Sequence, residues 1–298
     1  MMRTIYLATI RRYWSLTKPG VLFGNVITGV AGFFLASAYL RTFDPLLFVA
    51  TIGGMTLIIG SACAFNNVFD RDIDRIMTRT RQRAVASGSI KPVPALTFAA
   101  VLGIIGTAIL ALWTNWLVVA IGVGGFIVYV WLYGTLSKRR SIHGTLVGSI
   151  SGAAPILAGY VAVRGAIDTG AVLVFLALFF WQFPEFYSIA IYRKAEYASA
   201  HVPVATVVRG VAYAKRWIAI YAVLFVLTAL LLTSFGYTGY IYLACMAAIG
   251  VYWLALAVRG FRAVGTTASD AWARQMFHAS LNVLLLYSLL IALGPLLP

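Results

Sequence analysis

The chain has 298 residues, of which 62% are hydrophobic and 10% are charged, and its mean hydropathy is +0.92. A soluble domain carries about 25% charged residues, so this composition excludes an ordinary soluble protein and indicates a polytopic membrane protein. The formal net charge of +15 then points to basic loops facing anionic lipid headgroups rather than to a nucleic-acid partner. Cys63 and Cys245 form no CxxC motif and stand in apolar surroundings, which predicts two buried structural thiols.

Nine segments are apolar over the roughly 20 residues that a helix needs to cross a bilayer. The pattern predicts an all-α polytopic membrane protein with nine transmembrane helices. No separate soluble domain is visible, so we expect residues 1–298 to form one integral-membrane domain. The predicted segments are about 21–40, 46–66, 95–113, 116–136, 144–163, 170–191, 217–235, 240–258 and 276–296.

The basic residues are distributed unevenly between the two sides of the predicted bundle. The N-terminal stretch and the loops after the second, fourth, sixth and eighth segments hold 21 of the 23 lysines and arginines, whereas the other loops hold Arg41 and Arg164. The positive-inside rule therefore predicts a cytoplasmic N-terminus and a periplasmic C-terminus. The long loops, 67–94 and 192–216, lie on the predicted cytoplasmic face, where we expect the chemistry.

The stretch CAFNNVFDRDID, residues 63–74, places three of the eight acidic residues at the end of the second segment. Asn66, Asp70 and Asp74 are four residues apart and would share one face of a helix, whereas Asp72 points elsewhere and is expected to be the most replaceable acid. Clustered carboxylates near a membrane are costly unless a cation neutralises them. Hard oxygen ligands favour Mg²⁺ or Ca²⁺, and Mg²⁺ commonly uses one or two carboxylates together with waters and substrate phosphates, so the spacing predicts a site for such a cation.

Basic stretches surround this motif on the same predicted face. RIMTRTRQR (75–83) follows it directly and LSKRRSIHG (136–144) belongs to a later loop. Arginine and lysine side chains suit phosphate oxygens, so the pattern predicts a lipid diphosphate held through Mg²⁺, with its tail among the helices. Two alternatives stay open: the acids pair with the neighbouring arginines, or the bases only orient the protein in the membrane.

These motifs resemble those of a known family. NNVFDRDID followed by TRQRAVASGSI is similar to the first acidic signature of the intramembrane aromatic prenyltransferase superfamily, N-x3-D-x3-D with a downstream arginine. Five further stretches resemble its protohaem farnesyltransferase (haem O synthase) branch. They are LTKPGVLFGNVITGVAGFFLAS (16–37), SKRRSIHGTLVGSISGAAPILAGY (137–160), WQFPEFYSIAIYRKAEY (181–197), HVPVATVVRG (201–210) and WLALAVRGF (253–261).

The resemblance implies nine helices around a central cavity, Mg²⁺ as cofactor, and farnesyl diphosphate and haem B as substrates, with haem O and diphosphate as products. It also implies roles for individual residues. The expected residues are Asp70, Asp74 and Lys138 for catalysis; Asn66, Asp70, Asp74 and Glu196 for the metal; Lys18, Arg83, Lys138 and Arg139 for the diphosphate; and His143 or His201 for haem.

Two positions depart from the family pattern. The superfamily has a second D-x3-D after the sixth segment, where this chain reads YRKAE with Tyr192 first and Glu196 last. The haem branch also tends to keep only the last acid. At 184–186 the chain reads PEF where the branch often has PH, so a haem-ligand role cannot be carried onto Glu185. That carboxylate instead needs a partner such as a cation or Mg²⁺.

The resemblance further implies a multi-pass protein of a bacterial inner membrane, surrounded by lipid, with its active site at the cytoplasmic face. It implies contact with a haem-copper oxidase assembly pathway and no nucleic-acid partner. Two other functions remain as hypotheses. One is prenylation of a quinone precursor such as 4-hydroxybenzoate, and the other is a transporter or haem chaperone without chemistry.

Overall fold

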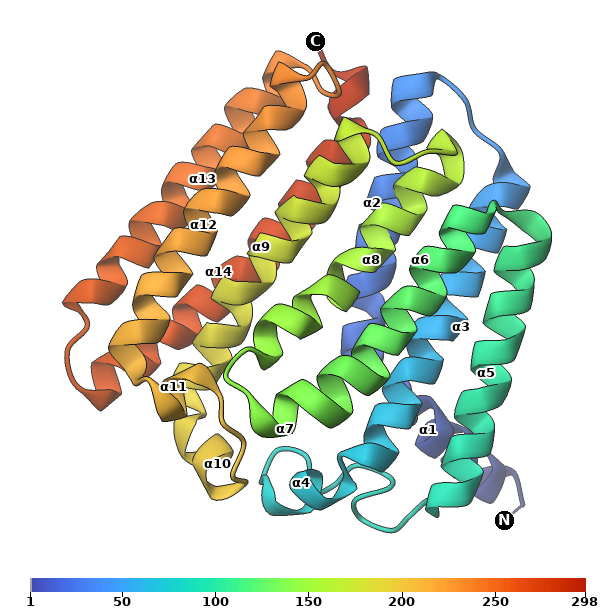
Figure 1. The fold of residues 1–298 in the computed structure, drawn as a ribbon, viewed down its shortest axis with the longest axis vertical. Helices are drawn as coiled ribbons and strands as arrows, with labels where there is room; N and C mark the ends of the chain where they lie inside the picture. Colours follow the sequence, from blue (N-terminus) through green and yellow to red (C-terminus); the bar gives the residue numbers. More distant parts are fainter. Residues whose placement is uncertain (1) are drawn as a thin grey trace.

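A computed structural model describes residues 2–298, and the side chains of residues 7 and 9–298. All regular elements in this part of the chain are helices, which confirms the all-α class. Figure 1 shows long helices running side by side, with the two chain termini at opposite ends of the bundle.

Within the described residues, nine helical spans are long and apolar enough to cross a membrane, as predicted. The spans are α2 (Pro19–Leu40), α3 (Pro45–Phe69), α5 (Pro92–Trp113), α6 (Trp116–Ile127) continued by η1 (Val128–Ser137) and α7 (Lys138–Arg140), α8 (Gly144–Arg164), α9 (Thr169–Tyr192), α12 (Val211–Ser234), α13 (Tyr240–Arg259) continued by η2 (Gly260–Arg262), and α14 (Thr266–Leu293) continued by η3 (Gly294–Leu296).

Short helices gather at one end of the bundle, together with the basic loops; we call this end the basic end (Figure 1). They lie in the N-terminal stretch and in loops for which the sequence pattern predicts no membrane-spanning helix. They are α1 (Met2–Leu16), α4 (Arg71–Ile76), α10 (Lys194–Ser199) and α11 (Ala205–Val208).

The largest boundary difference concerns α14, which begins at Thr266 instead of the predicted 276. Its first turns are too polar to count as a membrane segment, but they bury Ser269 and Trp272 against the bundle. The Trp272 indole Nε1 donates to the Leu256 carbonyl on α13 at 2.8 Å. Packing against a neighbouring helix therefore extends α14 beyond its apolar stretch.

Local signals explain where several helices begin. Pro19, Pro45 and Pro92 open α2, α3 and α5, a position where the missing N–H costs no hydrogen bond. Asp44 caps α3 by accepting from the Leu46 amide at 2.8 Å, and Asp168 caps α9 by accepting from the Ala171 amide at 3.0 Å. Both acids lie at the end opposite the basic end, so their role there is structural.

The backbones of α2 and α8 touch along a seam of glycines. A Cβ added at Gly159 would lie 2.0 Å from the Gly29 carbonyl oxygen, and one added at Gly32 would lie 2.1 Å from the Ile156 carbonyl oxygen. Side chains larger than hydrogen cannot fit there, because backbone atoms on the facing helix cannot move aside locally. Small residues at such seams are typical of helix pairs within membranes.

The outward faces of the bundle carry large exposed apolar side chains such as Ile104, Leu112 and Val251, as a lipid environment requires. Cys63 is buried, but Cys245 is exposed on α13. The prediction of two buried thiols is therefore wrong for Cys245, because apolar sequence surroundings do not distinguish a protein-facing side chain from a lipid-facing one.

The fourth span contains a π-helix, η1, that the sequence pattern does not reveal. A π-helix is wider than an α-helix and is frequent at functional sites. Gly134 lies in it, and a Cβ built there would be 3.7 Å from the side-chain nitrogen of Asn66. The widened segment thus lies directly beside the acidic motif on α3.

The glycine seam gives the first testable prediction. Gly159→Ala should lower the melting temperature of the purified protein in detergent, because the new methyl group overpacks the interface at a cost of about 1–3 kcal/mol. Gly53→Ala is the matched control, since a Cβ there meets nothing within 4 Å and alanine favours a helix by about 1 kcal/mol over glycine. Equal melting temperatures for the two variants would contradict the role of the seam.

Candidate active site

A cavity of about 790 Å³ reaches from the basic end into the middle of the bundle. Its inner wall is apolar and is formed by residues from several spans, including Met55, Ile58, Phe126, Leu178 and Leu284. Its outer part is lined by charged side chains. Such a cavity suits a ligand with a charged head and an apolar tail.

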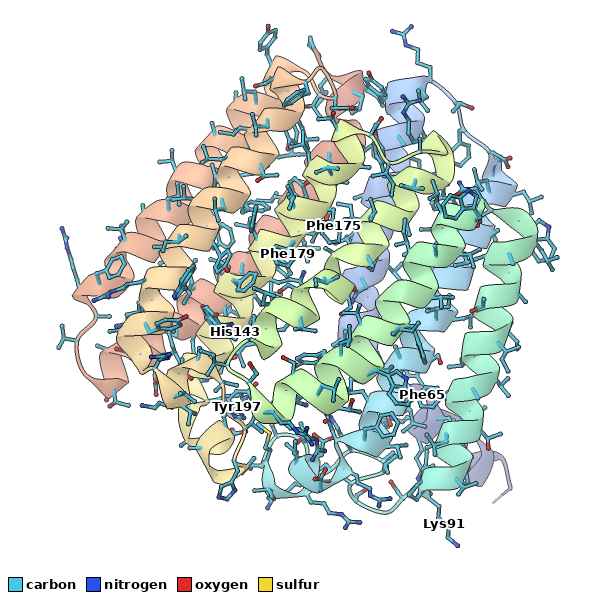
Figure 2. All side chains as sticks on the ribbon, in the orientation of Figure 1. Phe65, Lys91, His143, Phe175, Phe179 and Tyr197 are labelled. Atoms are coloured by element: carbon cyan, nitrogen blue, oxygen red, sulfur yellow. The ribbon has the colours of Figure 1, made fainter. Side chains whose placement is uncertain are left out.

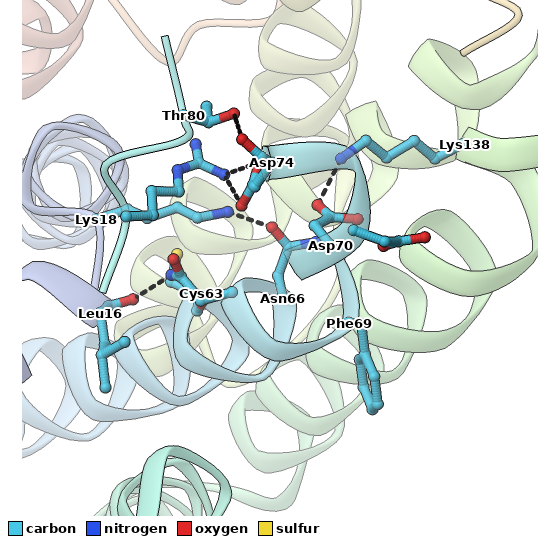
Figure 3. A network of polar contacts seen from close by, with 12 residues as sticks. Leu16, Lys18, Cys63, Asn66, Phe69, Asp70, Asp74, Thr80 and Lys138 are labelled. Atoms are coloured by element: carbon cyan, nitrogen blue, oxygen red, sulfur yellow. Dashed lines mark hydrogen bonds and ion pairs between the residues drawn. The ribbon is translucent and has the colours of Figure 1, made fainter. Parts of the chain in front are cut away.

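Asn66, Asp70 and Asp74 all lie on the wall of this cavity and are almost fully buried. α3 ends at Phe69 and α4 begins at Arg71, yet helix-type hydrogen bonds cross the junction. The Asp70 amide donates to the Asn66 carbonyl at 2.9 Å, and the Asp74 amide donates to the Asp70 carbonyl at 2.8 Å. The predicted shared face therefore persists through the joint, as Figure 3 shows.

Each of these three side chains meets a base from a different segment (Figure 3). The Lys18 Nζ donates to the Asn66 Oδ1. The Lys138 Nζ donates to the Asp70 Oδ2 at 2.5 Å, and Arg83 donates to both Asp74 carboxylate oxygens at 2.9 Å. The predicted diphosphate residues Lys18, Arg83 and Lys138 therefore meet the predicted metal residues directly.

Lys18 reaches this position through an unusual backbone conformation. It links α1 to α2 with a φ of +50°, in the left-handed region that residues other than glycine rarely adopt. Burial, followed by repulsion from Arg83, lowers the pKa of Lys18 to about 8. Both costs fall on a cation that faces the cavity, which is consistent with an anionic ligand at this site.

Asp72 faces away from the cavity, as its position in the motif predicts. Its carboxylate is largely exposed and pairs with Arg139 through two hydrogen bonds of 2.7 Å. This pairing lowers the pKa of Asp72 to about 2. Arg139 also donates to the Phe69 carbonyl at 2.6 Å and is not part of the cavity wall, so its position gives no support to the predicted diphosphate role.

The two neighbouring asparagines have different surroundings. Asn66 faces the cavity, whereas the Asn67 side chain donates to the Leu16 carbonyl at 2.9 Å and to the Cys63 carbonyl at 3.0 Å. Asn67 thereby fastens the end of α1 to α3, next to the turn that carries Lys18.

Other predicted residues lie away from the cavity wall. Glu196 on α10 accepts from Arg193 at 2.5 Å through one oxygen, while its Oε2 is buried without a hydrogen-bond partner. Among the described residues, no group of three or more acidic, histidine or cysteine side chains is arranged to hold a metal. His143 and His201 are exposed; Figure 2 shows His143 at the start of α8.

The cavity also contains side chains to which the sequence assigns no role. Tyr129 and Tyr133 project from η1 with ring centroids 5.7 Å apart, and Tyr197 projects from α10 (Figure 2). Arg79 lines the cavity, and no described residue forms an ion pair with it. The spacing of four residues between the two tyrosines could have suggested that they share a helix face. The chain has 42 aromatic residues, however, so this spacing does not single them out as cavity residues.

The charge on the wall is unbalanced in favour of an anion. Five cations line the cavity (Lys18, Arg79, Arg83, Lys138 and Arg193), against three carboxylates (Asp70, Asp74 and Glu185).

The Asp70 Oδ1 is buried and lacks a hydrogen-bond partner among the described residues. An unsatisfied carboxylate oxygen beside a second carboxylate and an amide oxygen is a donor set that fits Mg²⁺.

Comparison with known proteins identifies relatives over most of the chain. Residues 25–281 match the model of the UbiA prenyltransferase family. A protoheme IX farnesyltransferase from Yersinia pseudotuberculosis is 44% identical over 272 residues, covering 91% of this chain and 90% of that protein. The protein of the same name from Photorhabdus laumondii is 42% identical over 289 residues, covering 97% of each.

Two solved structures share the fold at low sequence identity. A structure described as digeranylgeranylglyceryl phosphate synthase has a TM-score of 0.78 at 19% identity and covers 95% of this chain and 98% of its own. A UbiA homologue from Archaeoglobus fulgidus bound to GPP and Mg²⁺ has a TM-score of 0.65 at 13% identity, covering 94% and 99%.

The different environments of the acids give a second prediction. Asp70→Asn should lower the turnover of a prenyl diphosphate by about 100- to 1,000-fold, the usual effect of removing one electrostatic group from an active site. Asp72→Asn removes an exposed ion pair worth at most about 1 kcal/mol and should cost less than about 10-fold. Diphosphate release measures both, and similar losses in the two variants would contradict the assignment.

Arg79 gives a third prediction. Arg79→Ala should weaken binding of a prenyl diphosphate by about 10-fold, because a charge-assisted hydrogen bond contributes about 1.5–3 kcal/mol. Arg81→Ala is the matched control, since Arg81 is exposed in the same loop and is not part of the cavity wall. Equal affinities for the two variants in an equilibrium binding measurement would exclude a ligand contact for Arg79.

Proposed function

The chain belongs to the UbiA prenyltransferase family of enzymes, and from this premise we propose that it transfers a farnesyl group from farnesyl diphosphate to a vinyl group of haem B. Water completes the product, haem O, and diphosphate is released. The relatives that match nine-tenths or more of the chain support this choice of donor and acceptor. The observation that carries the proposal is an apolar cavity whose mouth combines three oxygen ligands with several cations.

Mg²⁺ fits the residues at the mouth. Asn66, Asp70 and Asp74 would hold it, because they offer hard oxygen atoms on one wall and one of these oxygens lacks a partner. When bound, the ion would supply Lewis-acid stabilisation of the charge that develops on the leaving diphosphate. A homologous fold with GPP and Mg²⁺ bound supports the combination of metal and prenyl diphosphate.

The bases would hold the diphosphate itself. Lys18, Arg83 and Lys138 are paired with the acidic motif, so they already stand at the point where phosphate oxygens would lie. Arg79 adds a cation without an acid partner at the same mouth. Preorganised donors of this kind stabilise the transition state because they need little reorganisation during the reaction.

The tail and the allylic cation would lie deeper in the cavity. Tyr129 and Tyr133 line the same cavity as the acidic motif, and an aromatic face stabilises a nearby cation by about 0.5–2 kcal/mol. The loops that carry α4 and α10 close over the same end and would limit the entry of water. The packing of Ile73 and Met77 with Val202 joins these two loops.

The proposed setting is the inner membrane of a bacterium, with the basic end at the cytoplasmic face. The charge distribution along the chain supports this orientation. Haem B would enter from the lipid, in which it partitions. Because His143 and His201 lie off the cavity wall, their positions do not support the predicted contacts with haem.

A reconstituted assay tests the proposal. Membranes containing the protein, supplied with haem B, farnesyl diphosphate and Mg²⁺, should yield a haem heavier by one farnesyl group and one hydroxyl group, together with diphosphate. A chelator should stop the reaction, and excess Mg²⁺ should restore it. Membranes with the Asp70→Ala variant are the control.

Two outcomes would replace the proposal. Transfer of the labelled prenyl group to 4-hydroxybenzoate but not to haem would make the protein a quinone-precursor prenyltransferase. If no diphosphate is released in the presence of haem B or of 4-hydroxybenzoate, the transporter or haem-chaperone hypothesis would gain support in spite of the family membership.

A further inference from the structure

Glu185 and Asp270 are the two acidic residues for which the described part of the structure shows no partner. Six of the eight acids either cap a helix or pair with a base: Asp44, Asp70, Asp72, Asp74, Asp168 and Glu196. Asp270 has no described partner but lies near the start of α14 at the basic end, outside the main cavity. Glu185 lies within a membrane-spanning helix, and no described residue donates to it or pairs with it.

The position of Glu185 places it inside the substrate cavity. It stands on α9 directly after Pro184 and seven residues before the helix end at Tyr192, which corresponds to a depth of about 10 Å. It lines the same cavity as Asn66 and Asp70. A carboxyl group without a hydrogen-bond partner is costly to keep in an apolar region, so a polar part of a ligand or a water molecule should meet it during the reaction.

Gln182 provides a second acceptor on the same wall. Its Nε2 donates to the Ser149 carbonyl at 2.9 Å and to the Leu178 carbonyl at 3.0 Å, which identifies the other amide atom as oxygen. No described residue donates to that oxygen. Gly152 on α8 makes room for the amide, since a Cβ there would lie 2.0 Å from the Gln182 Oε1.

Gln182 and Glu185 are three residues apart on a helix, so their Cβ atoms lie about 5–6 Å apart. Two acceptors at this spacing suit one molecule with two donors. Water has two O–H donors, and once both are engaged its lone pairs remain free to attack. Haem and the prenyl chain offer no such pair of donors at the vinyl group.

We propose that Gln182 and Glu185 hold the water that completes the product, and that Glu185 accepts its proton. This inference rests on the proposed function. The carbon–oxygen bond of farnesyl diphosphate breaks, and diphosphate leaves with the electron pair. The first farnesyl carbon then bonds to the terminal vinyl carbon, which leaves a cation on the inner vinyl carbon.

The water oxygen bonds to this inner carbon, and one water proton passes to the Glu185 carboxylate and later to solvent. The atoms and charges balance without an oxidant or a reductant. Asp70 and Asp74 are less suited to this step, because each is engaged by a base at the mouth. Glu185 is thus the carboxylate on the cavity wall that is free to take a proton.

The test compares the products of the wild type, Glu185→Gln and Glu185→His in the complete protein, with haem B, farnesyl diphosphate and Mg²⁺. Glutamine keeps the shape but is not a base, so farnesyl transfer and diphosphate release should continue. The hydroxylated product should fall by about 100-fold or more, and a species lighter by one water should replace it. Histidine is a base and should restore the hydroxylated product.

Asp270→Asn is the matched control, because it removes the other acid without a described partner, outside the cavity. It should leave the ratio of hydroxylated to dehydrated product unchanged. In isotopically labelled water, the wild type should incorporate the label into the new hydroxyl group.

Three results would overturn the inference. One is a ratio of hydroxylated to dehydrated product in Glu185→Gln that equals the wild-type ratio. Another is a hydroxyl oxygen in the wild-type product that does not come from water. The third is loss of diphosphate release in Glu185→Gln accompanied by a changed haem absorption spectrum, which would make Glu185 a haem ligand. Absence of diphosphate release in the wild type would instead refute the proposed function, so the two failures are distinguishable.

Discussion

The structure depends on one electrostatic constraint: a carboxylate at the edge of a membrane needs a positive partner. The bases that pair with Asp70 and Asp74 come from segments outside α3, and so does Lys18, which donates to Asn66. Lys18 is 48 residues away from Asn66, and Lys138 is 68 residues away from Asp70. Satisfying this constraint brings the α1–α2 turn, the loop after α4 and the start of α7 to one place, and that place is the mouth of the cavity.

Much of the architecture could be predicted because it depends on local sequence. Hydropathy identifies the nine spans, since each must be apolar over its own length. The shared face of Asn66, Asp70 and Asp74 follows from helical periodicity, which survives the break at Asp70 because hydrogen bonds continue across it. Asp72 faces away for the same reason.

The rest depends on contacts between distant segments, which spacing cannot reveal. Arg139 adjoins Lys138 in sequence, yet it pairs with Asp72 outside the cavity while Lys138 turns inward. The left-handed turn at Lys18 and the π-helical winding of η1 carry no periodic signal. The role of Gln182 as a cavity acceptor depends on Gly152 from another helix, so α9 alone does not indicate it.

The pairing of Lys18, Arg83 and Lys138 with the acidic motif has a consequence for how ligands enter. Without substrate, Arg83 and Lys138 neutralise Asp74 and Asp70 in a low-dielectric setting, whereas Lys18 donates to the uncharged amide of Asn66. A divalent cation alone would displace bases that then have no counter-ion, and an anion alone would leave carboxylates uncompensated. The site therefore favours joint entry of metal and diphosphate, because each then compensates the charges that the other displaces, and the excess of cations on the wall accommodates a complex that is still anionic.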